Sequence, residues 1–121
     1  MNNILIVEDE PLIALDLSII VRESFGAEVT LASSVSAARR VIDGNTRFVF
    51  LDMNVIDGTT FELARMLLEW NVPFAFATDS RRSDVPGDLQ FVPFLSKPCT
   101  NRDVKRVLTV LDASGGAVGR S

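Results

Sequence analysis

The sequence predicts an α/β fold in which helices cover both faces of a parallel sheet. Two observations support this class: strand-like and helix-like segments alternate along the chain, and the strand-like segments are apolar runs without polar alternation. Such runs are typical of strands that are buried on both faces between helical crossovers. The predicted strands are Ile4–Val7, Glu28–Ala32, Arg47–Leu51, Phe74–Ala77 and Val92–Leu95.

Capping residues and apolar periodicity predict four helices between and after these strands. The first has Pro11 in its first turn, where proline is tolerated, and Gly26 at its end. The predicted helices are Glu10–Phe25, a short one capped by Ser33 or Ser34, one begun by a capping box of Thr59 and Glu62, and one capped by Thr100 and Asp103. Their expected buried positions are Val35, Ala38 and Val41; Phe61, Ala64, Leu67 and Leu68; and Val104, Val107, Leu108 and Leu111.

The step between the fourth and fifth strands is the weak point of the pattern. Only residues 81–89 are available for a helix there, and Pro86-Gly87 interrupts them. We therefore expect the helix of this step, which would be the fourth of five along the chain, to be short, distorted or mobile.

The length of the chain is that of one domain. Its 121 residues are 47% hydrophobic, which is enough for a core and far from the composition of a disordered chain. We expect one domain at residues 1–112 and a flexible C-terminal tail at residues 113–121, where Gly and Ser are frequent.

Composition excludes several classes of function. The net charge of −4 argues against nucleic acid as a partner, because binding to phosphates needs a basic surface. Cys99 is the only cysteine and the chain has no histidine, which excludes an internal disulfide, histidine-based triads and the usual zinc sites. The sequence shows neither a signal peptide nor an apolar stretch that could span a membrane, so the expected location is the cytoplasm.

Polar residues follow four of the predicted strands, at the edge where open parallel sheets bind ligands. They are Glu8 and Asp9 after the first strand, Asp52 after the third, Thr78 after the fourth and Lys97 after the fifth. Each has an ordinary explanation when taken alone, such as an acid at a helix N-terminus or a hydroxyl at a strand end. Their joint placement at one edge is the stronger signal.

The charges of this group predict a cation. Three carboxylates and one ammonium leave two negative charges, which one divalent ion balances. Because the available ligands are hard oxygen atoms, magnesium is the expected metal, with manganese as an alternative.

Four segments resemble the signature blocks of two-component response-regulator receiver domains of the chemotaxis-regulator type. The blocks are Ile4–Glu10, Phe48–Asp52, Phe76–Thr78 and Phe94–Pro98. The likeness extends from about Asn3 to Leu111. More loosely, Val72–Thr78 is similar to the small regulators associated with HWE-type sensor kinases.

This resemblance implies a flavodoxin-like (βα)5 doubly wound sandwich with the sheet order 2-1-3-4-5. It also implies a bacterial phosphorelay regulator. In such a protein Asp52 accepts a phosphoryl group from a phosphohistidine of a sensor histidine kinase or a phosphotransfer protein, and the transfer switches contacts with a downstream protein. The chain would not be an enzyme beyond catalysing its own phosphorylation and slow autodephosphorylation.

The resemblance also assigns roles to individual residues. Asp9, Asp52 and the backbone carbonyl of Asn54 would bind Mg2+ directly, with Glu8 reaching it through water. Thr78 and Lys97 would bind the phosphoryl oxygens. Thr78 and Phe94 stand at the switch positions, although a plain core role for Phe94 is equally compatible with the sequence.

Two departures from the pattern concern residues near Asp52 and Thr78. Ile56 stands where many receivers have proline, which predicts a less rigid loop after Asp52. Asp79 follows Thr78 where a small residue is customary, and its carboxylate could repel a phosphodonor or hinder the hydrolytic water.

Three alternatives remain at this point. A degenerate receiver would act by protein contact without phosphorylation. A magnesium-dependent phosphohydrolase with an aspartyl-phosphate intermediate would need a second acid where this chain has Asn54. A flavodoxin-type cofactor module would need a phosphate loop, but the acidic residues after the first strand would repel a phosphate.

Overall fold

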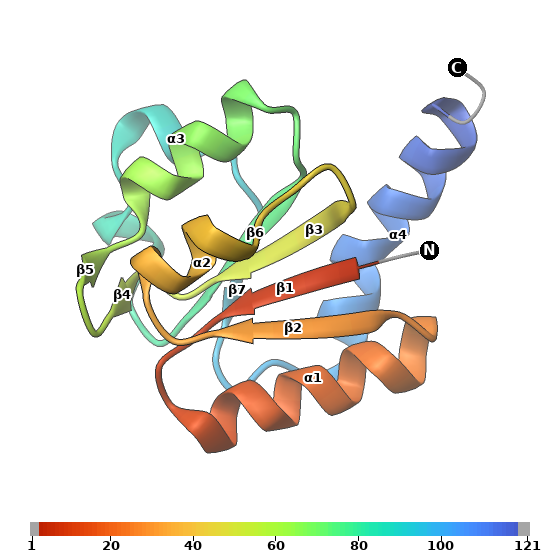
Figure 1. The fold of residues 1–121 in the computed structure, drawn as a ribbon, viewed down its shortest axis with the longest axis horizontal. Coiled ribbons are helices and arrows are strands. Elements are labelled where there is room, and N and C mark those ends of the chain that lie inside the picture. Colours follow the sequence, from red (N-terminus) through yellow and green to blue (C-terminus); the bar gives the residue numbers. More distant parts are fainter. Residues whose placement is uncertain (1–2, 119–121) are drawn as a thin grey trace.

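The computed structural model describes the backbone of residues 3–118 and the side chains of residues 3–109. Five parallel strands form one sheet with the order β2-β1-β3-β6-β7 (Figure 1). Counted along the sheet strands alone, this is the predicted order 2-1-3-4-5, so the predicted fold class is confirmed. The strands are β1 (Asn3–Val7), β2 (Glu28–Ala32), β3 (Thr46–Leu51), β6 (Phe74–Thr78) and β7 (Phe94–Ser96).

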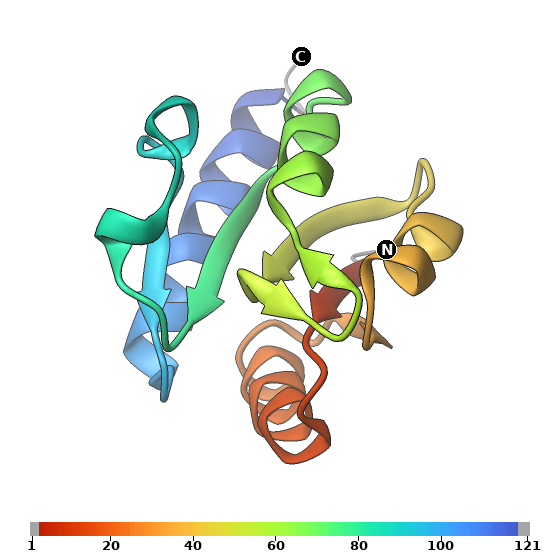
Figure 2. The same cartoon turned by 90° about the vertical axis from the view of Figure 1, so that its left-hand side faces the viewer.

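Helices cover both faces of the sheet, as Figures 1 and 2 show. Helices α1 and α4 lie against one face, whereas α2, α3 and two short 3-10 turns, η1 and η2, lie against the other. Their bounds are α1 (Pro11–Phe25), α2 (Val35–Val41), α3 (Phe61–Glu69), η1 (Arg82–Asp84), η2 (Gly87–Leu89) and α4 (Asn101–Val118). No helix formed by the described residues is long and apolar enough to cross a bilayer.

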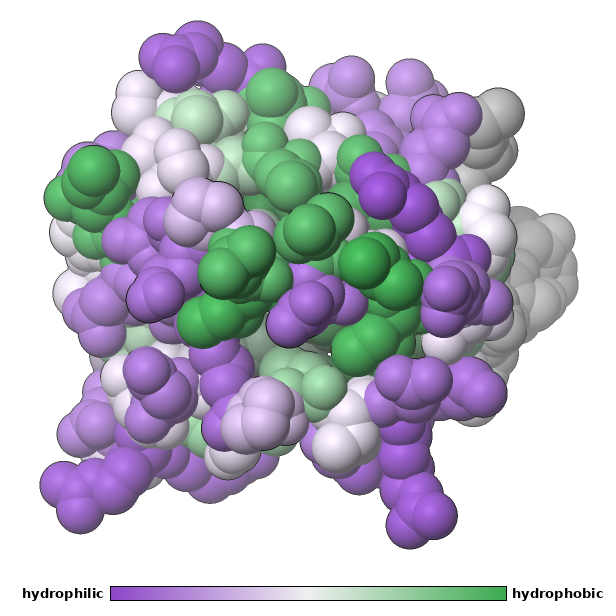
Figure 3. Space-filling model, turned by 90° about the horizontal axis from the view of Figure 1, so that it is seen from below, coloured by the Kyte–Doolittle hydropathy of each residue, from purple (hydrophilic) through white to green (hydrophobic). Residues whose placement is uncertain are grey.

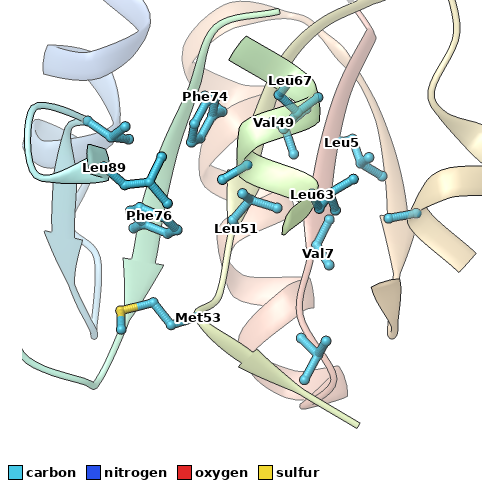
Figure 4. Packing of buried hydrophobic residues seen from close by; sticks show 14 of the residues in the cluster. Leu5, Val7, Val49, Leu51, Met53, Leu63, Leu67, Phe74, Phe76 and Leu89 are labelled. Atoms are coloured by element: carbon cyan, nitrogen blue, oxygen red, sulfur yellow. The ribbon is translucent and has the colours of Figure 1, made fainter. Parts of the chain in front are cut away.

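Each sheet strand contributes to two apolar clusters because its side chains point alternately to the two faces. Leu5 and Val7 pack under α2 and α3, whereas Ile4 and Ile6 pack under α1 and α4. The strands are apolar on both faces for this reason. Figure 4 shows the first cluster, in which Leu63 of α3 lies among the strand residues.

A small hairpin between β3 and α3 was not predicted. Strands β4 (Asn54–Val55) and β5 (Gly58–Thr59) pair in antiparallel fashion around a two-residue turn at Ile56 and Asp57. Gly58 has a φ of +130°, a conformation that other residues rarely adopt.

The hairpin shifts the start of α3, so the predicted capping box of Thr59 and Glu62 is wrong. Thr59 belongs to β5, and Thr60 is the N-cap residue. The buried face of the helix differs accordingly. Leu68 is 38% exposed, and Leu63, which was not predicted, is completely buried.

The irregular fourth crossover is confirmed: η1 and η2 replace a helix between β6 and β7. The fifth sheet strand begins later than predicted, since Val92 is buried in a bend before Pro93 and Phe94. Helix α4 continues to Val118, past the predicted domain boundary at residue 112. The predicted burial of Leu111, and residues 119–121 of the predicted tail, lie outside the described part of the chain, so the tail's flexibility stays a prediction.

Candidate functional site

The acidic residues predicted to meet at the sheet edge do so. Val7 is paired with Leu51 in the β1–β3 register, and the amide of Asp52 donates to the carbonyl of Val7 at 3.0 Å. The next residues, Glu8 and Asp52, therefore leave the sheet side by side. Carboxylate oxygens of Glu8, Asp9 and Asp52 all lie within 4.8 Å of one another.

Two of these three carboxylates are buried. Glu8 is 6% and Asp52 8% exposed, whereas Asp9 is partly exposed. Burial disfavours a charged carboxylate and raises the pKa of Glu8; the neighbouring charge of Asp52 adds to this effect. Buried carboxylates in such proximity require a positive charge among them.

Lys97 supplies one positive charge. Its Nζ donates to Oδ2 of Asp52 at 2.9 Å and also forms an ion pair with Glu8. Burial lowers the pKa of Lys97, but the contacts with Glu8 and Asp52 outweigh burial and raise the pKa overall. Lys97 therefore remains charged and cross-links the ends of β1 and β3 from its position after β7.

The contact between Glu8 and Lys97 was not predicted. Oε1 of Glu8 faces Lys97, and Oε2 accepts a hydrogen bond from the amide of Glu10 at 3.0 Å. Glu8 thus holds the lysine in place, a role separate from the predicted water-mediated contact with a metal. The count of charges at the strand ends was the one sequence signal that pointed to such a pairing.

The remaining predicted residues lie around this cluster. Thr78 is completely buried at the end of β6, and its Oγ1 accepts a hydrogen bond from the amide of Ser80 at 3.1 Å. The carbonyl of Thr78 accepts from the amide of Lys97 at 2.9 Å, which joins the two residues at adjacent strand ends. Asn54 is exposed on β4, two residues after Asp52.

Phe94 lies on β7, opposite Phe76 of β6. The ring is partly buried against the cluster under α3, and the guanidinium carbon of Arg82 lies 5.2 Å from the ring centroid. Its position is compatible both with a core residue and with a switch residue.

The cluster fits a hard divalent cation. Three carboxylates provide oxygen ligands, and with the ammonium of Lys97 in contact with two of them the group has two negative charges in excess. Magnesium prefers such oxygen ligands and binds through one or two carboxylates in phosphoryl-transfer sites. The donor set is therefore suited to Mg2+.

No protein-family model and no curated protein sequence matches the chain, but solved structures do. SdrG from Sphingomonas melonis Fr1 is 34% identical, with a TM-score of 0.78 over 92% of this chain and 96% of that chain. The receiver domain of the PhyR response regulator from Erythrobacter litoralis is 27% identical, with a TM-score of 0.79 over 92% of this chain and 89% of that chain.

A third structure supports the fold alone. TrrA from Thermotoga maritima, solved in complex with Mg(2+)-BeF, is 22% identical with a TM-score of 0.80, over 92% of this chain and 99% of that chain. The assignment of this chain to a family rests instead on its sequence identity with SdrG over nearly the whole of both chains, together with the acidic pocket at the sheet edge. This chain belongs to the response regulator receiver domains, the CheY-like family of two-component signal transduction.

Proposed function

We propose that this receiver accepts a phosphoryl group on Asp52 from a phosphohistidine of a sensor histidine kinase or a phosphotransfer protein, in a magnesium-dependent reaction. One observation carries the proposal. Asp52 lies buried at a strand end, among two further carboxylates and a lysine that binds one of its oxygens. An aspartate that only capped a turn would not need this surrounding charge.

The chemistry asks the chain's own residues to orient the nucleophile and to neutralise charge. A carboxylate oxygen of Asp52 forms a bond to phosphorus while the phosphorus–nitrogen bond of the phosphohistidine breaks, and the bonding electrons remain on the histidine nitrogen. Lys97 fixes the orientation of the carboxylate through Oδ2 beforehand. Asp9, Asp52 and the carbonyl of Asn54 would hold Mg2+, with Glu8 acting through water, and the ion when bound supplies charge neutralisation at the phosphoryl oxygens.

Phosphorylation would then change the balance of contacts at the site. The phosphorylated side chain carries more negative charge than the carboxylate, so it competes with Glu8 for Lys97. The hydroxyl of Thr78 is the other donor we assign to the phosphoryl group. Thr78 and Lys97 stand at the ends of β6 and β7, the strands that flank the irregular crossover. Movement of these two side chains toward the phosphoryl group would shift the equilibrium toward an active conformation.

The surface beside the site supports a protein partner. Leu12, Leu15 and Ile19 are 76%, 45% and 41% exposed on α1, at a spacing that places them on one side of the helix. Figure 3 shows apolar residues gathered on this lower face of the molecule. An exposed apolar surface of this kind marks a site of interaction.

The test is intact mass spectrometry after incubation with acetyl phosphate and Mg2+. We expect one phosphoryl adduct on the wild-type chain and none on Asp52→Asn. Asp43→Asn is a matched control, because Asp43 is an exposed aspartate near the opposite end of β3. Chelation of the metal with EDTA should abolish the adduct in both the wild type and the control. If the wild type gains no adduct under these conditions, the chain acts by protein contact alone.

A further inference from the structure

Thr60 is a completely buried polar residue that the proposed chemistry does not use. It lies between the β4–β5 hairpin and α3. Its Oγ1 donates to the carbonyl of Asp52 at 2.6 Å, and its amide donates to the carbonyl of Met53 at 3.0 Å. One residue thus holds the carbonyls of the phosphoacceptor and of the residue after it.

These two bonds fix the direction of the next carbonyl, that of Asn54. In an antiparallel ladder, hydrogen-bonded and non-hydrogen-bonded pairs alternate. The bond from Thr60 to Met53 marks one bonded position, so the next pair, Asn54 and Thr59, is a non-bonded one. The carbonyl of Asn54 therefore points away from β5 and is available to a ligand.

We propose that Thr60 is a positioning residue for magnesium: by binding the Asp52 carbonyl, its hydroxyl sets the path of the chain from Asp52 to Asn54. This inference rests on the proposed function, in which Asn54 supplies a metal ligand through its carbonyl. The hydrogen bond from Thr60 explains how the loop after Asp52 keeps one conformation although it has Ile56 where many receivers have a rigid proline. The loop is fixed from within the core.

The chemistry of the side chain accounts for threonine at this position. A buried hydroxyl needs a hydrogen-bond partner, and the bond to Asp52 provides it. Valine has nearly the same shape but cannot donate this bond, whereas serine can. Residues that orient metal ligands typically change metal affinity by about tenfold to a hundredfold when they are replaced. Thr60 acts on one of several ligands, so we expect the lower end of this range.

The experiment measures Mg2+ affinity by calorimetry and the carbonyl chemical shift of Asn54 by NMR during a Mg2+ titration. Thr60→Val should bind Mg2+ about tenfold more weakly, with a reduced shift at Asn54, and Thr60→Ser should stay close to the wild type. Thr46→Val is the matched control. Thr46 is also a buried threonine, its Oγ1 accepts from the amide of Asp43 at 3.1 Å, and it lies at the other end of β3.

Asp9→Asn separates this inference from the proposed function. If Asp9→Asn leaves Mg2+ affinity unchanged, the proposed metal site is wrong. If Asp9→Asn weakens binding but a folded Thr60→Val binds as tightly as the wild type, only the role of Thr60 is overturned. Should Thr60→Val fail to fold, Thr60→Ala takes its place in the same comparison, and equal weakening by Thr46→Val would also overturn the inference.

Discussion

Two crossovers cover the same face of the sheet but are built differently. Between β3 and β6 the chain forms the β4–β5 hairpin and the helix α3, whose residues Leu63, Ala64 and Leu67 are completely buried. Between β6 and β7 it forms only η1 and η2, and this segment contributes the single residues Val85, Leu89 and Val92 to the same cluster. The first crossover contributes a regular helix to the core, whereas the second contributes single residues from short turns.

Polar contacts near the surface hold the second crossover in place. Arg65 of α3 donates to both carboxylate oxygens of Asp88, at 2.9 and 3.1 Å. The side-chain amide of Gln90 donates to the carbonyls of Arg82 and Val85, each at 2.8 Å. The ion pair of Arg65 and Asp88 is exposed and stabilises little, and η1 and η2 are only single short turns. The second crossover should therefore open locally at a lower free-energy cost than α3. Since it joins Thr78 to Phe94, the softer crossover is also the one that connects the proposed switch residues.

The largest expected effect compares Leu63→Ala with Leu89→Ala, since both leucines are completely buried. Leu63→Ala should lower the free energy of unfolding by about 3 kcal/mol, because α3 cannot collapse into the cavity. Leu89→Ala should cost less than half as much, because η2 can relax around the smaller side chain. Urea unfolding followed by circular dichroism measures both values. Equal losses would mean that the two crossovers are equally part of the core.

The sequence predicts the parts of the molecule that depend on apolar patterning. The sheet strands are short buried runs. The strands β1 and β3 are apolar along almost their whole length, which is typical of strands in the centre of a sheet. The apolar runs also determine where the strands end. Because these ends lie at one edge of the sheet, they bring Glu8, Asp52 and Lys97 together. The sequence also predicts the irregular crossover between β6 and β7, because Pro86-Gly87 is incompatible with the interior of a regular helix.

The β4–β5 hairpin depends on contacts between residues far apart in the sequence, and these were not predictable. Asp57 at its turn accepts hydrogen bonds from the amides of Val35 and Ser36 at 2.8 and 3.1 Å, which ties the hairpin to the start of α2. These bonds lower the pKa of Asp57, the one to Val35 most. The hydroxyl of Thr60 likewise binds a carbonyl eight residues earlier. Neither partner can be identified from residue type or local spacing.

A severalfold effect is expected from Asp79→Ala, at the start of the softer crossover. Asp79 is exposed and lines an apolar groove of about 660 Å³ together with Lys97 and Ile13. Its carboxylate should repel the phosphodonor or hinder the hydrolytic water, so its removal should change the rate of phosphorylation or of dephosphorylation severalfold. Incorporation from acetyl phosphate and the subsequent decay measure the two rates. Asp84→Ala, an exposed aspartate farther along the same crossover, should leave both unchanged. Unaltered rates in Asp79→Ala would contradict the prediction.

The smallest effect is expected from Asp88→Asn, which weakens the link between the two crossovers. The bond from Arg65 lowers the pKa of Asp88, so the contact is complete above the ordinary pKa of an aspartate and is lost as the pH falls through the lower pKa of the folded state. At neutral pH the variant should reduce hydrogen-exchange protection of the Leu89, Gln90 and Val92 amides by about twofold, since exposed ion pairs stabilise little. The α3 amides should not change. At a pH below the pKa of Asp88 in the folded protein, the wild type and the variant should exchange alike. A difference that persists there would show that Asp88 holds the crossover through its shape and not through its charge.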